Sequence, residues 1–301
     1  MIKRTLYFGN PAYLHLSNAQ LIIDLPATAT EAKREVTVPI EDIGIVVLDS
    51  PQLTISSGLL QALQGNNVAV ISCDARHMPQ SLLLPLEGNT IQQERYDAQL
   101  AATEPLKKQL WQQTITQKIR NQAAQLQQQG IAGNYLHTLA RNVKSGDADN
   151  AEATAAVHYW GALFNHIPNF TRGREGIPPN NYLNYGYAIL RATVARSIVA
   201  AGLLPTLGIF HKNRYNAYCL ADDIMEPYRP YVDGVVCAMI QELGLVEVLT
   251  KEYKAVLLKL PAMDVVIDGE KSPLMLATQR TAVSLVKCYE GSQRKLLYPE
   301  L

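Results

Sequence analysis

The sequence has few of the features that mark secreted, membrane or zinc-binding proteins. Its 301 residues include only four cysteines and no CxxC pair, and each cysteine stands in an apolar stretch. We therefore expect buried free thiols in a reducing compartment, with no disulfide framework and no zinc site. No apolar run approaches the ~18 residues of a membrane-spanning helix, and the segment MIKRTLYFGNPAYL does not have the pattern of a signal peptide. The sequence thus predicts a cytoplasmic protein with no membrane partner.

The formal net charge is zero, with 27 basic and 27 acidic residues, so the overall charge does not indicate a nucleic-acid partner. The two parts of the chain differ, however. Residues 1–100 contain 6 basic and 10 acidic residues, which leaves 21 basic and 17 acidic residues in residues 101–301. This asymmetry favours the second part as the place where an anionic partner binds. The phosphate-binding pattern GxxxxGK[ST] is absent, so nucleotide hydrolysis through a P-loop is not expected.

Residues 1–88 have the pattern of short β-strands. Turn residues separate apolar or alternating segments, and Asn18-Ala19 lies between two of them as a hairpin turn. One helix is expected at Ser56–Gln64, with a serine as its cap and Gly65 at its end. The spacing predicts a small β-sandwich or folded sheet and not a parallel αβ unit. The expected strands are Thr5–Phe8, Tyr13–Ser17, Gln20–Asp24, Glu35–Pro39, Ile43–Asp49 and Val68–Ser72.

The composition changes near Gly88, after which helix-forming residues dominate. Beyond Pro105, which falls at the start of a long helix, apolar residues recur at helical spacing. We therefore predict an α+β fold with a small β-rich domain at 1–88, a linker and helix start at 89–104, and a larger all-helical catalytic domain at 105–301. Further helices are expected at Tyr135–Val143, Ala151–Phe164, Tyr182–Ala201, Asn216–Leu243, Lys251–Leu258 and Pro273–Tyr289.

The segment GIFHKNRYNAYCLADDIMEPYRPYVD, residues 208–233, carries the most informative polar residues. His211 ends a short extended stretch, and Asn216 is expected to cap the helix that follows. Within that helix Asp223 and Glu226 are three positions apart, so their carboxylates share a face. One imidazole and two carboxylates suit a divalent ion such as Mg²⁺ or Mn²⁺. The structural alternatives are an acidic helix start that faces solvent and a histidine packed in the core.

Glu152 is the candidate for a further ligand. It opens the helix expected at Ala151–Phe164, directly after the turn-rich segment 146–150. A glutamate in the first turn of a helix also acts as a capping or dipole-compensating residue, so its position alone leaves both roles open.

Basic residues near these acidic residues can contact a phosphodiester backbone. Arg172 and Arg174 stand in a glycine-flanked loop that can lie against phosphates. For any single arginine, a solvated surface position is the alternative. A basic ring around a metal site is nevertheless what a phosphodiester substrate requires. The candidates for DNA contact are Arg172, Arg174, Lys212, Arg214 and Arg229.

The segment 208–233, together with NNYLNYGYAILRA, closely resembles the CRISPR adaptation integrases, the Cas-one proteins, in the form found in type II systems. The histidine, the fourteen-residue gap, the glutamate and the PYRP tail occur together, and the resemblance extends over the whole chain. It implies that Glu152, His211 and Glu226 bind the Mg²⁺ or Mn²⁺ ion and that Asp223 is an adjacent acidic residue of the catalytic site. It also implies a homodimer formed through the N-terminal domain, a bridging dimer of the small Cas-two protein and an association with the RNA-guided effector nuclease.

The reaction that this resemblance implies is a transesterification. The 3′-hydroxyl of a short DNA fragment attacks a phosphodiester at the edge of a CRISPR repeat, and a metal ion stabilises the charge that develops. Two alternatives stay open. A metal-dependent nuclease of branched or damaged DNA would share every ligand and differ only in the absence of strand joining. A non-enzymatic scaffold would bind no divalent ion.

A substitution separates the chemistry from the folding. We expect Glu226→Ala to abolish integration and to leave the fold nearly intact, because carboxylates gathered without metal repel one another.

Overall fold

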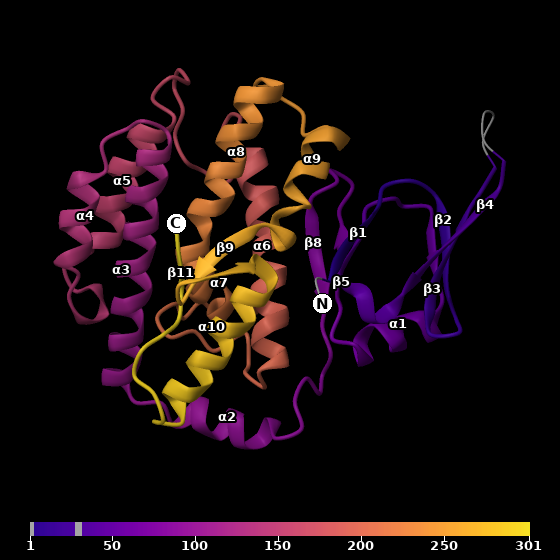
Figure 1. Cartoon of the computed structure of the whole chain (residues 1–301), viewed down its shortest axis with the longest axis horizontal. Helices are drawn as coiled ribbons and strands as arrows, with labels where there is room; N and C mark the ends of the chain where they lie inside the picture. The colour runs from indigo at the N-terminus through magenta and orange to yellow at the C-terminus, as the bar shows by residue number, and fades with distance from the viewer. Residues whose placement is uncertain (1–2, 28–31) are drawn as a thin grey trace. The chain divides into compact units, whose positions relative to one another are not determined.

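The computed structural model describes residues 3–27 and 32–301 (Figure 1). The chain folds into two compact units, Met1–Gly88 and Asn89–Leu301. Strands dominate the first unit and helices the second, so the fold is of the mixed α+β kind. Within the described ranges, none of the helices has both the length and the apolar character that a membrane span requires.

In its described residues, 3–27 and 32–88, the first unit contains two four-stranded sheets and one α-helix. Its elements are β1 (Arg4–Phe8), β2 (Ala12–Ser17), β3 (Gln20–Leu25), β4 (Arg34–Pro39), η1 (Ile40–Asp42), β5 (Ile43–Leu48), β6 (Leu53–Ile55), α1 (Ser57–Gly65), β7 (Ala69–Cys73) and β8 (Pro79–Leu83). One sheet has the order β1-β5-β7-β8, in which only β8 is antiparallel to its neighbour. The other has the order β4-β3-β2-β6, with β6 parallel to β2 and the other pairs antiparallel.

Both sheets and α1 contribute to a single hydrophobic core. Leu14 of β2, Val46 of β5 and Leu59 of α1 belong to the same buried cluster. This arrangement confirms the predicted sandwich of short strands. The prediction that excluded a parallel αβ unit is wrong, because the chain crosses through β6 and α1 between β5 and β7 and returns in the same direction. Continuous β-branched runs, as in these two strands, are typical of parallel pairing.

Local turn and cap chemistry in this unit agrees with the sequence. β2 and β3 pair about Asn18 and Ala19, whose φ angles are 47° and 57°. Positive φ at both central residues is the signature of a tight type I′ hairpin turn. The Ser56 side chain accepts a hydrogen bond from the Leu59 amide at 3.3 Å and so caps α1 as predicted.

The second unit is built mainly from helices. They are α2 (Gln92–Ala101), α3 (Glu104–Gln128), α4 (Asn134–Arg141), η2 (Ser145–Asp147), α5 (Ala151–Leu163), α6 (Asn180–Ala200), α7 (Cys219–Met225), η3 (Glu226–Tyr228), α8 (Arg229–Leu243), α9 (Lys251–Leu257), η4 (Leu260–Ala262) and α10 (Leu274–Tyr289). Thr103 caps the long helix α3, and Pro105 lies in its first turn. Residues 89–104, where we expected a linker and a helix start, hold α2. The four cysteines are free thiols, and all but the half-buried Cys73 are buried.

The second unit also contains a three-stranded antiparallel sheet, so the prediction of an all-helical domain is wrong. The strands are β9 (Asp264–Ile267), β10 (Glu270–Pro273) and β11 (Pro299–Glu300), in the order β10-β9-β11. β9 and β10 form a hairpin about Asp268 and Gly269, which have φ angles of 55° and 76°. An Asp-Gly pair directly after a β-branched run is a strong hairpin signal in the sequence.

The helix predicted at Asn216–Leu243 is interrupted. It consists of α7, the short η3 and α8, with Pro227 and Pro230 each near the start of a new segment. Proline lacks the amide hydrogen that a continuous α-helix needs, so the α-helical hydrogen-bond pattern is interrupted here, although Met225, Glu226, Tyr228 and Arg229 keep helical dihedral angles. Asn216 does not cap α7 either. Its side chain accepts from the Tyr218 amide at 2.9 Å, within the turn that precedes the helix.

Candidate functional site

Glu152 stands in the first turn of α5, where a buried aspartate fixes the start of the helix. Asp147 accepts hydrogen bonds from the amides of Ala151 and Glu152, at 2.8 and 3.1 Å. Asn150 has a φ of 54°, which turns the chain back over Asp147 just before the helix begins. A side-chain carboxylate that accepts from these free amides caps the helix. The cap sets the point from which Glu152 reaches across to α3.

Glu226 stands at the break between α7 and η3. A hydrogen bond from α3 fixes the next residue, Pro227: Asn121 donates to its carbonyl oxygen at 2.7 Å. Glu226 is 5% exposed. Its Oε1 accepts a hydrogen bond from Arg229 Nε at 2.7 Å. This carboxylate is therefore buried and faces Lys118 of α3.

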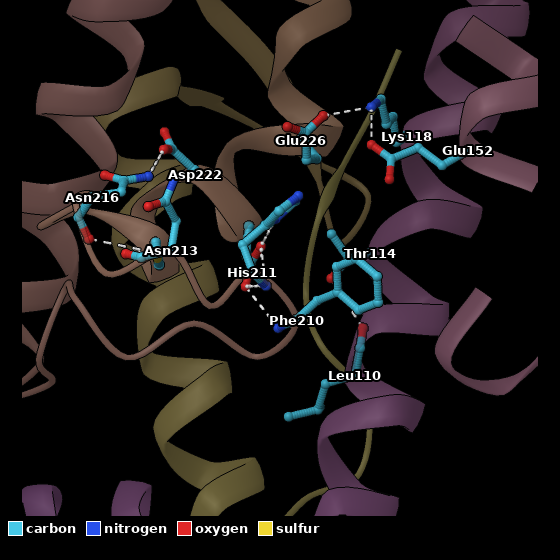
Figure 2. A network of polar contacts seen from close by, with 12 residues as sticks. Leu110, Thr114, Lys118, Glu152, Phe210, His211, Asn213, Asn216, Asp222 and Glu226 are labelled. Atoms are coloured by element: carbon cyan, nitrogen blue, oxygen red, sulfur yellow. Dashed lines mark hydrogen bonds and ion pairs between the residues drawn. The ribbon is translucent and has the colours of Figure 1, made fainter. Parts of the chain in front are cut away.

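The two glutamates meet at Lys118, which lies on the buried face of α3. Figure 2 shows the ammonium group between the two carboxylates. Lys118 Nζ lies 2.6 Å from Glu152 Oε1 and 2.6 Å from Glu226 Oε2. Three elements that are far apart in the sequence thus bring two carboxylates to one cation.

His211 lies on the loop before α7 and is oriented by Asp223. Asp223 is fully buried, and one of its oxygens accepts a hydrogen bond from the Phe210 amide at 2.9 Å. Its other oxygen bonds His211 Nδ1, which leaves Nε2 of the ring available. A Cβ atom at Gly208 would lie 2.7 Å from the same carboxylate, so a glycine is required for this close approach.

Aromatic packing holds the loop in place. The Phe210 ring is 45% exposed and stacks on the buried Trp111 of α3 with 4.4 Å between centroids. The His211 ring meets Trp111 edge-on at 5.5 Å. His211 is itself exposed, with 46% of its side chain accessible. It is therefore fixed in orientation and open to a substrate, and it is not a core histidine.

Contacts among the site residues shift the pKa values of His211, Asp223 and Glu226. The hydrogen bond to Asp223 raises the pKa of His211, and the charges of Glu226 and Glu152 add to that effect. Burial raises the pKa of Asp223, although His211 and the backbone amides oppose it. Burial also acts to raise the pKa of Glu226, but Arg229 and Lys118 outweigh it and lower this pKa to about 2. Glu226 is therefore a carboxylate at any physiological pH.

The predicted metal ligands are gathered but do not form a closed cage. In the part of the chain that the structure describes, no three His, Cys, Asp or Glu side chains stand where they could hold a metal ion as they are oriented. Glu152 and Glu226 converge on one positive charge, and His211 feels the charge of both. Glu226 Oε2 is buried, and its partner is the Lys118 ammonium at 2.6 Å. Two convergent carboxylates beside an oriented imidazole are a donor set that fits Mg²⁺ or Mn²⁺.

The predicted DNA-contacting residues divide into two groups. Arg174, Lys212 and Arg214 are exposed. Lys212 Nζ lies 3.2 Å from Glu104 Oε1, and the guanidinium of Arg214 lies over the ring of the exposed Tyr215.

The other two predicted arginines make internal contacts. Arg172 donates to Asn180 and Asn184, each at 2.8 Å, and Arg229 is bonded to Glu226. Of the five, the exposed Arg174, Lys212 and Arg214 are thus the side chains best placed for phosphate.

Lys118 was missed from the sequence, although α3 carries a signal that could have found it. Polar residues recur at helical spacing among apolar residues that face the core. They are Thr114, Lys118, Asn121, Gln122 and Gln125, and all are buried. A lysine on the apolar face of a predicted helix requires an acidic partner from elsewhere in the fold.

Comparison with known proteins adds to this geometry. The family model for CRISPR associated protein Cas1 matches residues 6–268. The chain is 35% identical, over its full length and 97% of the relative, to the CRISPR-associated endonuclease Cas1 of Neisseria meningitidis serogroup C (strain 8013).

Solved structures share the fold. A casposase bound to integration product matches with a TM-score of 0.79 and 21% identity, over 98% of this chain and 92% of that chain. A chain of a Cas6-RT-Cas1–Cas2 complex matches with a TM-score of 0.71 and 19% identity, over 97% of this chain and 35% of that chain.

Proposed function

The chain belongs to the family of CRISPR-associated protein Cas1, and we propose that it is a divalent-ion-dependent DNA integrase that joins short fragments to a CRISPR repeat. The observation that carries the proposal is the meeting of Glu152 and Glu226 at one cation, with the oriented His211 beside them. Relatives named as endonucleases and a casposase bound to integration product support the class of reaction.

In this proposal Glu152, Glu226 and His211 hold one Mg²⁺ or Mn²⁺ ion. Such an ion supplies the Lewis acid that polarises a phosphate oxygen at the scissile bond. The other residues prepare the site. Asp223 holds His211 with Nε2 free, and Arg229 fixes one oxygen of Glu226 so that the other faces the site.

The reaction exchanges one phosphodiester for another. The 3′-hydroxyl oxygen of the incoming fragment forms a bond to phosphorus, and the bond from phosphorus to the repeat's own 3′ oxygen breaks. The leaving oxygen takes up the proton that the attacking hydroxyl gives up. Arg174, Lys212 and Arg214 would contact the DNA backbone on either side, because exposed cations near the site neutralise phosphates.

The proposal includes an assembly. Its proposed DNA partners are the short fragments and the CRISPR repeat. Its proposed protein partners are a second copy of this chain, a Cas2 dimer and the RNA-guided effector nuclease. The match to a chain of a complex that contains Cas2 supports the second protein. Dimerisation through Met1–Gly88 would cover exposed strand edges, which otherwise favour aggregation.

A strand-joining assay tests the proposal. Purified protein, the candidate Cas2 partner, a short DNA with free 3′ ends and a repeat-bearing plasmid are incubated with Mn²⁺ or with EDTA. We expect joining in Mn²⁺ only, and a loss of roughly 100-fold or more, about 3 kcal/mol of barrier, for Glu152→Gln. The matched control is Asp149→Asn, since Asp149 is exposed on the loop before α5 and pairs with Lys144. DNA cleavage without joining would instead indicate a nuclease of branched or damaged DNA.

A further inference from the structure

Lys118 stands where a metal ion would balance the two glutamates. Its ammonium lies 2.6 Å from an oxygen of each carboxylate, and the residue is 8% exposed. The ammonium group is thus held as a counterion between two carboxylates that come from α5 and η3.

The charges in this group are already balanced. Glu152 and Glu226 contribute two negative charges, and Lys118 and Arg229 contribute two positive charges. A divalent ion added to this arrangement would face an ammonium group at contact distance from the same oxygens. Like charges at such separations repel strongly in a buried site. The ion and the Lys118 ammonium therefore cannot share both carboxylates.

The two cations differ in their freedom to move. Arg229 is held by its bond to Glu226 and by the ring of Tyr187, over which its guanidinium lies at 4.6 Å. Lys118 carries its charge at the end of a flexible four-carbon chain, and lysine ammonium groups are strongly hydrated when they reach water. Lys118 is thus the cation that can leave.

We propose that Lys118 is a built-in competitor for the divalent ion: it holds Glu152 and Glu226 together in the metal-free protein, and the ion binds by displacing it from both carboxylates. The inference rests on the proposed metal site. In this account Lys118 is a positioning residue that keeps the two glutamates from moving apart. It also lowers the affinity for the ion, because its displacement is part of binding.

Replacing Lys118 by methionine keeps the length of the side chain and removes the charge. Without metal, the half-buried Glu152 carboxylate and the buried Glu226 carboxylate then repel each other, and the variant is less stable than the wild type. With metal, no cation has to be displaced, so the ion binds more tightly. A purely structural lysine would show the loss of stability without the gain in affinity.

Full-length wild type, Lys118→Met and Lys144→Met are compared, the last because Lys144 forms an exposed ion pair with Asp149 nearby. Binding of Mn²⁺ alone is followed by the electron paramagnetic resonance of the free ion, and melting temperature is measured with and without EDTA. We expect Lys118→Met to bind Mn²⁺ about tenfold more tightly or better, to melt lower in EDTA and to gain more from Mn²⁺. Lys144→Met should follow the wild type in each measurement.

A second variant guards against misfolding. In Lys118→Gln the amide can donate a hydrogen bond to a carboxylate without a charge, and it should also bind Mn²⁺ more tightly than the wild type. Equal or weaker Mn²⁺ binding by the folded Lys118 variants would overturn this inference. The metal site itself would still stand if the wild type binds Mn²⁺ and Glu226→Gln does not. If neither wild type nor variant binds Mn²⁺ through Glu226, the proposed function fails as well.

Discussion

At the residue scale, Glu226 is the most heavily paired acidic group of the site. It bonds Arg229 with one oxygen and faces Lys118 with the other, and it is buried. This pairing argues against the expectation from the sequence that its removal leaves the fold nearly intact. Carboxylate repulsion is already relieved in the metal-free protein, so the removal of Glu226 would leave Arg229 without this carboxylate and the buried Lys118 with Glu152 alone.

We therefore predict that Glu226→Gln loses both metal-dependent joining and stability. In EDTA its free energy of unfolding should fall by about 3 kcal/mol, the usual scale for one broken buried ion pair. Urea denaturation measures the stability, and the joining assay is run well below the melting temperature. Asp149→Asn serves as the control, because it breaks an exposed pair of little energetic value. A variant as stable as the wild type would contradict the pairing seen here.

A further buried carboxyl, that of Asp233, lies close to the site. Asp233 of α8 accepts hydrogen bonds from the hydroxyls of Tyr159, at 2.8 Å, and Tyr187. Burial raises its pKa from 3.8 to about 6, against the lowering effect of the two tyrosines and two arginines. Between these two values the folded protein holds a proton that the unfolded chain releases. The contribution of Asp233 to stability is therefore lost as the pH rises through this window.

Asp233→Asn should remove this pH dependence. The difference in unfolding free energy between variant and wild type should grow in favour of the variant by about 2 kcal/mol from about pH 4.5 to about pH 7. Urea denaturation across that pH range measures the two unfolding free energies. Taking the difference between variant and wild type cancels the titration of all other groups. A difference that stays flat would mean that Asp233 is not buried between the two tyrosines in solution.

At the element scale, the position of Glu152 depends on how α5 begins. Asp147 caps the helix through the amides of Ala151 and Glu152 itself. We predict that Asp147→Ala lowers the free energy of unfolding by about 1 kcal/mol, a typical value for a lost cap, and also slows strand joining. Asp149→Ala, two residues away but exposed, should change neither. Full joining activity in Asp147→Ala would show that the cap does not position Glu152.

The elements that the sequence predicts well are those whose signals are local. The Asn18-Ala19 hairpin, the Ser56 cap of α1 and the start of α3 all depend on residues within a few positions. The break between α7 and α8 was missed although its prolines are visible, because apolar spacing continues through both helices. The β9–β10 hairpin is hard to predict for a different reason: it is short, and strong helical patterns stand on either side of it.

The candidate site is harder to predict because it depends on contacts between distant segments. Asp223 is only twelve positions from His211, so their grouping could be proposed from the sequence. Lys118 is 108 residues before Glu226, and no local pattern indicates that α3 and η3 meet. The buried polar residues of α3 indicate that a partner exists but not which one.

At the scale of the whole molecule, the excess of basic residues in residues 101–301 predicts binding to DNA that is dominated by phosphates. The logarithm of the affinity for duplex DNA should fall linearly with the logarithm of salt concentration, by about 0.9 per phosphate neutralised. Arg214→Ala should make that slope shallower by about one contact. Arg280→Ala is the control, since Asp268 and Glu270 already neutralise Arg280. An affinity that does not depend on salt would refute the prediction.

The central claim is that Glu152, His211 and Glu226 act together on one divalent ion. Crystals of the full chain grown with Mn²⁺ test it most directly, through anomalous diffraction from the metal. We predict one strong peak about 2.0–2.5 Å from a carboxylate oxygen of Glu152, a carboxylate oxygen of Glu226 and Nε2 of His211. An ordered Mn²⁺ bound elsewhere, with Lys118 still between the two glutamates, would contradict it.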